Sequence, residues 1–214
     1  MAKIKDHSLY LIISEEFGKE RSALEIAKLA IAGGVDIIQM REKNKPANEL
    51  LKLGRDLSGL CAKSNVIFMI NDNPSIAKKA GADGVHLGQE DMSIYPIAMA
   101  RSIMGEDKII GISTHSLSQF EKAGEEDVDY IAFGPVFPTK TKDYFIGIRD
   151  VKKVLGNAKK PVFFIGGINL INIDELLGMG AENIALIRGI TETDEIVSKT
   201  RQFKNRITGF KRGG

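Results

Sequence analysis

The sequence is poor in cysteine and has no large excess of charge of either sign. A single cysteine, Cys61, excludes an intramolecular disulfide and a cysteine-rich metal cage, and its place on a leucine stripe predicts a core position. The formal net charge of +2 is too small to argue for a nucleic-acid partner. We therefore expect the basic C-terminal end to form a solvated helix face and a tail over 208–214, with these cations: Lys199, Arg201, Lys204, Arg206, Lys211 and Arg212.

Long apolar runs are also missing. No stretch approaches the roughly 18 to 20 apolar residues that a membrane span requires. The first residues lead into a polar segment and not into the apolar core of a signal peptide. The expectation is a cytoplasmic protein without a membrane partner.

Several catalytic signatures are absent as well. The first apolar run is not followed by a glycine-rich dinucleotide or P-loop motif. The histidines lack the spacing of a zinc site, and His86 reads as a core histidine at a strand end. Ser113 and His115 are two residues apart without a nucleophile elbow, which argues against acyl transfer.

Eight short, continuously apolar runs are present instead. Continuous apolarity is typical of strands that are buried on both faces of a parallel sheet. The predicted strands cover residues 9–13, 36–40, 66–70, 84–87, 108–112, 130–133, 161–165 and 183–187.

Segments with helical spacing separate these runs. Apolar stripes such as Leu50, Leu53, Leu57 and Leu60 predict helices, and Ser116 with Gln119 reads as a capping box. A weak repeat at 32–36, 80–84, 124–129 and 179–183 predicts one type of glycine-containing turn before a strand. Alternation of eight strands with helices predicts a single-domain (β/α)₈ TIM barrel over 1–214, in preference to a doubly wound sheet.

Polar residues follow the predicted strands, at the end of the barrel where active sites of this fold lie. Asp72 and Asp91 would follow neighbouring strands and could share Mg²⁺, which takes one or two carboxylates together with phosphate oxygens. Arg41 and Lys43 would point the same way toward phosphate, whereas Glu42 would point the other way and could bind its neighbours structurally. These residues predict a magnesium and diphosphate site.

Two further loops favour phosphate binding. The segment 134–147 is long for a loop and carries Thr139, Thr141 and Lys142. The glycine pair Gly166-Gly167 and the segment Ile187-Arg188-Gly189 follow the seventh and eighth predicted strands, where this fold often binds phosphate.

Taken in order, these motifs resemble the thiamine phosphate synthase family from about Tyr10 to Ile190. The motifs are Gln39-Met40-Arg41-Glu42-Lys43, Ile70-Asn71-Asp72, His86-Leu87-Gly88-Gln89-Glu90-Asp91, Gly111-Ile112-Ser113-Thr114-His115, the run from Gly134 to Lys142, and Ile165-Gly166-Gly167-Ile168. The resemblance implies a cytoplasmic transferase that joins hydroxymethylpyrimidine diphosphate to a thiazole phosphate, releases pyrophosphate and uses Mg²⁺. It leaves a homo-oligomer open.

The resemblance also implies roles for individual residues. Arg41, Lys43, Ser113 and Lys142 would be catalytic, and Asp72 and Asp91 would bind the metal. The pyrimidine diphosphate would be held by Gln39, Met40, Arg41, Glu42, Lys43, Asn71, Ser113 and Lys142. The thiazole phosphate would be held by Thr139, Lys140, Thr141, Gly167, Ile187 and Arg188.

Two departures from the family pattern affect these expectations. Arg188 stands where the family commonly has serine, and Tyr144-Phe145-Ile146 replaces a smaller and more polar run. The alternatives are a thiazole tautomerase-like paralogue and a non-catalytic sensor of thiamine precursors. Against the first alternative, Pro135 follows Gly134 at the place where the tautomerases have a Gly-His pair. Against the second, Asp72, Asp91 and Lys142 are retained.

Overall fold

Eight parallel strands close into a barrel in the computed structural model, which describes residues 3–140 and 143–210. Each strand pairs with its neighbours in chain order, and β1 pairs with β8. The strands are β1 (Leu9–Ile13), β2 (Ile37–Met40), β3 (Ile67–Asn71), β4 (Gly84–Leu87), β5 (Ile109–Thr114), β6 (Tyr130–Phe133), β7 (Val162–Ile165) and β8 (Asn183–Leu186). The predicted TIM barrel is confirmed, and all eight predicted strands lie within one or two residues of the observed ones.

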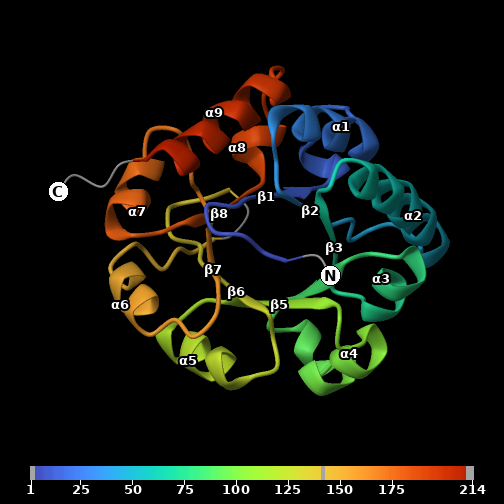
Figure 1. Ribbon diagram of the computed structural model, residues 1–214, viewed down its shortest axis with the longest axis horizontal. Coiled ribbons are helices and arrows are strands. Elements are labelled where there is room, and N and C mark those ends of the chain that lie inside the picture. The colour runs from blue at the N-terminus through green and yellow to red at the C-terminus, as the bar shows by residue number, and fades with distance from the viewer. Residues whose placement is uncertain (1–2, 141–142, 211–214) are drawn as a thin grey trace.

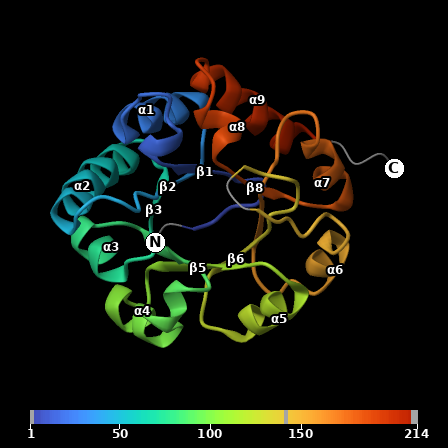
Figure 2. The same cartoon turned by 180° about the vertical axis from the view of Figure 1, so that it is seen from behind.

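Helices form a ring around the barrel in both views (Figures 1 and 2). The α-helices are α1 (Ala23–Gly33), α2 (Ala47–Lys63), α3 (Pro74–Ala80), α4 (Ile97–Met104), α5 (Leu117–Glu125), α6 (Val151–Gly156), α7 (Ile173–Met179), α8 (Arg188–Thr191) and α9 (Ile196–Gly209). Two 3₁₀ helices, η1 (Glu15–Phe17) and η2 (Asp91–Ser93), follow β1 and β4. Because the last helix packs against α1, the ring closes as the sheet does.

Alternate residues of each strand serve two different cores. Residues that point outward, such as Ile38, Phe68 and Phe164, pack against the helices, and Cys61 is buried in this layer as predicted. Residues that point inward fill the barrel with a second cluster built around Tyr10, Tyr130 and Phe163. Burial on both faces is the reason why the strands are apolar without alternation.

The glycines of the weak sequence repeat cap helices in three of its four copies. Gly34, Gly81 and Gly180 adopt the left-handed conformation and cap α1, α3 and α7, as the repeat predicts. The prediction was wrong at Gly124, which lies inside α5, so that this copy turns without a left-handed glycine.

A polar residue at or near the end of each repeat copy links neighbouring strands. The side chains of Asp36, Asp83, Asp129 and Asn183 accept hydrogen bonds of 2.7–3.0 Å from the backbone N–H groups of Leu9, Phe68, Ile110 and Ser8. Each bond joins the start of one strand to an adjacent strand at the end of the barrel remote from the predicted site. The repeat therefore marks a stabilising device.

The predicted helix start at Ser116 is confirmed with one difference. The Ser116 hydroxyl accepts the N–H of Gln119 at 3.2 Å, as a cap should. The Gln119 side chain does not return to Ser116, however; it accepts the N–H of His115 at 2.7 Å. The pair therefore fixes the position of His115 as well as the start of α5.

The basic C-terminal helix uses several of its cations within the fold. Lys204 pairs with Asp36 at 2.7 Å, and Arg206 pairs with Asp174 on α7. The part of the predicted tail beyond Phe210 lies outside the described residues. No helix among the described residues combines the length and apolarity needed to cross a membrane.

Arg101 on α4 makes several polar contacts at the end of the barrel remote from the site. Its guanidinium donates to Asp127 at 3.0 Å, to Asp129 at 2.9 Å and to the carbonyl of Lys108 at 2.5 Å, although its side chain is only 9% exposed. Arg101→Ala is expected to lower the free energy of unfolding by about 2 kcal/mol, because the carbonyl and carboxylates lose their donors. Urea denaturation would measure this.

Arg101→Lys is the matched control, because lysine keeps the charge but lacks the planar fork. It is expected to recover less than half of the lost stability. Equal stability of the lysine variant and the parent would contradict a role for the fork geometry.

Candidate functional site

Asp72 and Asp91 lie together at the mouth of the barrel, beyond the ends of β3 and β4. Their carboxyl groups are close enough for Asp91 to raise the pKa of Asp72. The N–H of Asp72 donates to the carbonyl of His86 at 2.8 Å, and Asp91 accepts the N–H of Gly88 at 2.8 Å. A backbone bond between the two strand ends and a side-chain contact within the loop after β4 thus hold the two carboxyl groups side by side.

The electrostatics of Asp72 show that this arrangement is costly. Its pKa is raised to about 7, first because burial disfavours the charged form and then because Asp91 lies beside it; Lys43 and Arg41 oppose the shift. Asp72 also adopts a left-handed backbone conformation, with φ of 67°. Strain and unfavourable charge at one residue are features of functional sites.

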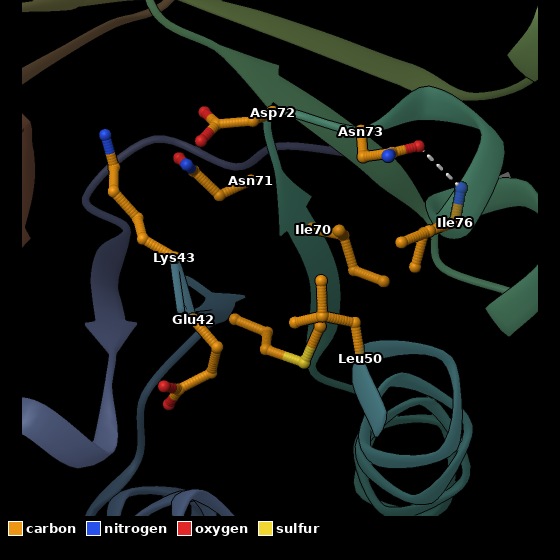
Figure 3. Close-up of a pocket in the computed structure, with 9 residues that line it drawn as sticks. Glu42, Lys43, Leu50, Ile70, Asn71, Asp72, Asn73 and Ile76 are labelled. Carbon is orange, nitrogen blue, oxygen red and sulfur yellow. Dashed lines mark hydrogen bonds between the residues drawn. The ribbon is translucent and has the colours of Figure 1, made fainter. Parts of the chain in front are cut away.

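Arg41 and Lys43 follow β2 and place positive charge close to the carboxylates. The N–H of Arg41 continues the β1 to β2 pairing by donating to the carbonyl of Ile13 at 2.9 Å. Figure 3 shows Lys43 directed toward the side of the pocket occupied by Asn71 and Asp72. The structure therefore brings together the predicted cations, the asparagine and the carboxylates.

Two residues of the same segment lie differently. Met40 is buried in the outward-facing core and lines the apolar side of this pocket, with Leu50, Ile70 and Ile76. Glu42 points away from Lys43 in Figure 3, and its carboxylate accepts the N–H of Glu15 at 2.7 Å. Burial raises the pKa of Glu42. Glu42 thus makes a structural contact, as expected for a side chain that points away from Arg41 and Lys43. This contact joins the loops that follow β1 and β2.

Gln39 and Ser113 point into the barrel and are linked by a chain of hydrogen bonds. Gln39 donates to the Tyr10 hydroxyl at 2.9 Å, which lies 2.9 Å from the Tyr130 hydroxyl. His86 contacts that hydroxyl through Nδ1 and the Ser113 hydroxyl through Nε2, both at 2.8 Å. Sequence reasoning missed Tyr10, Tyr130 and this role of His86, because within buried strands they read as core residues. Burial lowers the pKa of His86 to about 4.

The loop between β6 and α6 follows the carboxyl end of β6, at the mouth of the barrel. Thr139 is half-buried and Lys140 exposed, whereas Thr141 and Lys142 lie outside the described residues. Further along, Ile146 donates its N–H to the carbonyl of Pro135 at 2.8 Å, and the ring of Tyr144 meets His115 edge-on. Tyr144, one of the aromatic residues that depart from the family pattern, therefore packs against the end of β5.

The glycine pair after β7 touches this loop. Gly166 and Gly167 both have positive φ, and a side chain on Gly167 would collide with the carbonyls of Phe137 and Pro138. Asn172 donates to the carbonyl of Gly167 at 3.0 Å. The close approach of two loops is thus one reason for glycine here, in addition to the ligand contact expected from the sequence.

Arg188 begins α8, directly after Ile187, and is partly buried. Its guanidinium carbon lies 4.4 Å from the centre of the Phe17 ring, and Nη1 is 3.5 Å from Glu192. Nε is buried and is without a hydrogen-bond partner among the described residues. The structure therefore places Arg188 against η1, at the corner between the loops that follow β1 and β8.

Comparison with known proteins decides the family. A family model described as thiamine monophosphate synthase matches residues 9–190, which include all eight strands of the barrel and the segments from Gln39 to Lys43 and from Asp72 to Asp91. The chain belongs to the thiamine monophosphate synthase family. It is accordingly an enzyme of thiamine biosynthesis and a transferase of the thiamine-phosphate synthase type.

Relatives in this family resemble the chain over nearly its whole length. The thiamine-phosphate synthase of Dictyoglomus turgidum is 38% identical and covers 98% of this chain and 94% of its own. That of Persephonella marina is 38% identical, with 96% and 98% covered. The solved thiamine phosphate pyrophosphorylase of Pyrococcus furiosus is 33% identical, with a TM-score of 0.86 and 94% and 96% of the two chains covered.

The carboxylate pair of this family member fits Mg²⁺ on chemical grounds. Among residues 3–140 and 143–210 no group of three or more histidine, cysteine or acidic side chains could form a full metal cage. Two adjacent carboxylates that repel each other, with cations alongside, match an ion that takes its remaining ligands from phosphate and water. Asp72 and Asp91 are the residues that would hold it.

Proposed function

We propose that this enzyme condenses 4-amino-2-methyl-5-(diphosphooxymethyl)pyrimidine with hydroxyethylthiazole phosphate, or its carboxylated tautomer, to give thiamine phosphate and pyrophosphate. The observation that carries the proposal is the meeting of Asp72 and Asp91 with Lys43 and Arg41 at one side of the barrel mouth. A diphosphate needs both positive side chains and a shared cation, and this is the chemistry those residues provide.

The proposed substitution is dissociative. The aminopyrimidine ring can delocalise positive charge at its methylene carbon, so the enzyme needs to stabilise the departing pyrophosphate more than to activate the nucleophile. Arg41, Lys43 and Lys142 would neutralise the charge that develops on the leaving group. Mg²⁺ held by Asp72 and Asp91 would supply further charge stabilisation on the diphosphate oxygens.

The other residues would position the two substrates. In this proposal Gln39, Asn71 and Ser113 orient the pyrimidine diphosphate, with Met40 and Glu42 supporting that side from behind. Thr139, Lys140, Thr141, Gly167, Ile187 and Arg188 would receive the thiazole phosphate. The thiazole nitrogen brings its own lone pair, so alignment of the two substrates replaces a general base.

A direct assay tests the proposed function. Purified protein is incubated with both substrates, with and without Mg²⁺, and thiamine phosphate and pyrophosphate are quantified. We expect both products in equal amounts, and only in the presence of Mg²⁺. No product, under conditions in which the Persephonella marina relative is active, would refute the proposal.

Calorimetry and a reaction without the pyrimidine distinguish the two alternatives, which the comparisons do not favour. A sensor would bind a substrate in calorimetry without forming product. A tautomerase-like enzyme would convert the carboxylated thiazole phosphate in the absence of the pyrimidine.

A further inference from the structure

The hydrogen-bond chain inside the barrel runs from a buried end to an exposed end. Gln39 and Tyr10 are each 2% exposed, Tyr130 is fully buried and His86 is 7% exposed. Only Ser113, the last member, is partly open to the mouth of the barrel. Strands β2, β1, β6, β4 and β5 each contribute one member, so the chain crosses the interior and not merely one edge of it.

The buried end fixes the direction of the hydrogen bonds. The Gln39 amide nitrogen can only donate, so the Tyr10 oxygen accepts, and the Tyr10 proton must find another partner. That partner is Tyr130, 2.9 Å away. In the opposite direction, the Tyr10 proton would be left in a buried position without an acceptor, which folded proteins avoid.

The direction passes through His86 to Ser113. Because Tyr130 accepts from Tyr10, its own proton points at Nδ1 of His86, which must be unprotonated. The ring proton is then on Nε2 and is donated to the Ser113 oxygen. The Ser113 hydroxyl proton is left to point away from His86, toward the mouth.

We propose that Tyr10, Tyr130 and His86 are positioning residues that make Ser113 a hydrogen-bond donor toward an acceptor atom of the bound pyrimidine diphosphate. This inference rests on the proposed function. It assigns to the buried tyrosines and the histidine a task beyond filling the barrel, and it identifies the partner of Ser113 as an acceptor and not the exocyclic amino group of the pyrimidine.

A double-mutant cycle tests the proposal. Ser113→Ala and Tyr130→Phe are made singly and together, and kcat and KM are measured for the pyrimidine diphosphate. Tyr130→Phe is expected to lower kcat about tenfold, the kinetic equivalent of about one hydrogen bond. The double variant is expected to be no slower than Ser113→Ala alone, because Tyr130 acts through Ser113.

Conservative replacements of His86 and a distant control sharpen the result. His86→Gln carries an amide donor near the position of Nε2 and is expected to retain more activity than His86→Asn, whose amide lies nearer Tyr130. Thr200→Val removes a buried hydroxyl that bonds only within α9, and it should leave kcat unchanged.

Nitrogen NMR of the histidine-labelled protein provides a readout that a purely structural role would not predict. His86 is expected as the Nε2–H tautomer in the parent and as a tautomer mixture in Tyr130→Phe. An Nδ1–H tautomer in the parent, or additive losses in the double-mutant cycle, would overturn the proposal. Absence of product from the parent protein would instead refute the proposed function, while the tautomer measurement would still decide the direction of the chain.

Discussion

Replacement of Asp91 by alanine is expected to lower Mg²⁺-dependent turnover by about 10²- to 10³-fold, the range seen when one group that stabilises developing charge is removed. Asp91 sits beside Asp72, and within residues 3–140 and 143–210 no third histidine, cysteine or acidic side chain joins them in a group that could hold a metal ion. Among the described residues the proposed cation site would thus have two protein ligands, and loss of one would leave a single carboxylate. Steady-state rates over a range of Mg²⁺ concentrations would measure the effect.

Loss of the proposed metal ligand must be separated from damage to the loop. The Asp91 carboxylate also accepts the N–H of Gly88, so alanine removes a structural contact as well. Asp91→Asn keeps an oxygen for this N–H and is expected to match the parent in thermal unfolding while losing turnover nearly as far as alanine does. Turnover of either variant at the parent's rate would contradict the metal role of Asp91.

Asp72→Asn is a second control, for which we expect an increase in stability together with a loss of turnover. Burial and the adjacent Asp91 raise the Asp72 pKa, so Asp72 destabilises the metal-free fold progressively as the pH rises from about 4 to about 7, and in full above that. The residue is partly exposed and solvent screens part of this cost. Asp72→Asn is therefore expected to raise the Tm of the metal-free enzyme by about 2–4 °C, corresponding to about 1 kcal/mol, while turnover falls.

The fold could be predicted from the sequence because local and long-range signals agree. Strands buried on both faces leave continuous apolar runs. Before four of the eight strands the turn repeats a polar residue that bonds to the adjacent strand, as Asp36 and Asp83 do. Gly124 misled because a glycine before a strand is also compatible with the last turn of a helix, where α5 uses it. Spacing alone does not distinguish these conformations.

The site was predictable only where its residues are polar in an apolar setting. Asp72, Asp91, Arg41 and Lys43 stand out at strand ends, and the structure brings them together. The roles of Tyr10, Tyr130 and His86 depend on contacts between strands as much as 120 residues apart. The direction in which Arg188 would lie was equally hidden, because its partner Phe17 belongs to the opposite end of the chain.

The largest expected loss of stability is inside the barrel, at Gly111. A Cβ atom on Gly111 would lie 2.0 Å from the ring of Tyr130. The ring cannot move aside, since it packs edge-on against Tyr10 and Phe163 and is stacked on His86. Gly111→Ala is therefore expected to cost about 3 kcal/mol of unfolding free energy through overpacking. Urea denaturation would measure this loss.

Gly124→Ala provides the matched control, because a Cβ there meets no atom within 4 Å and the residue lies in a helix, where alanine is favoured over glycine. It should leave stability unchanged or slightly raised. A Gly111→Ala/Tyr130→Leu double variant is expected to recover part of the lost stability, since the collision is with the ring. Its turnover is expected to stay below that of the parent, since the link from Tyr10 to His86 is broken. If Gly111→Ala were as stable as the parent, the barrel interior would be loose enough for Tyr130 to shift, and a fixed hydrogen-bond direction toward Ser113 would no longer follow.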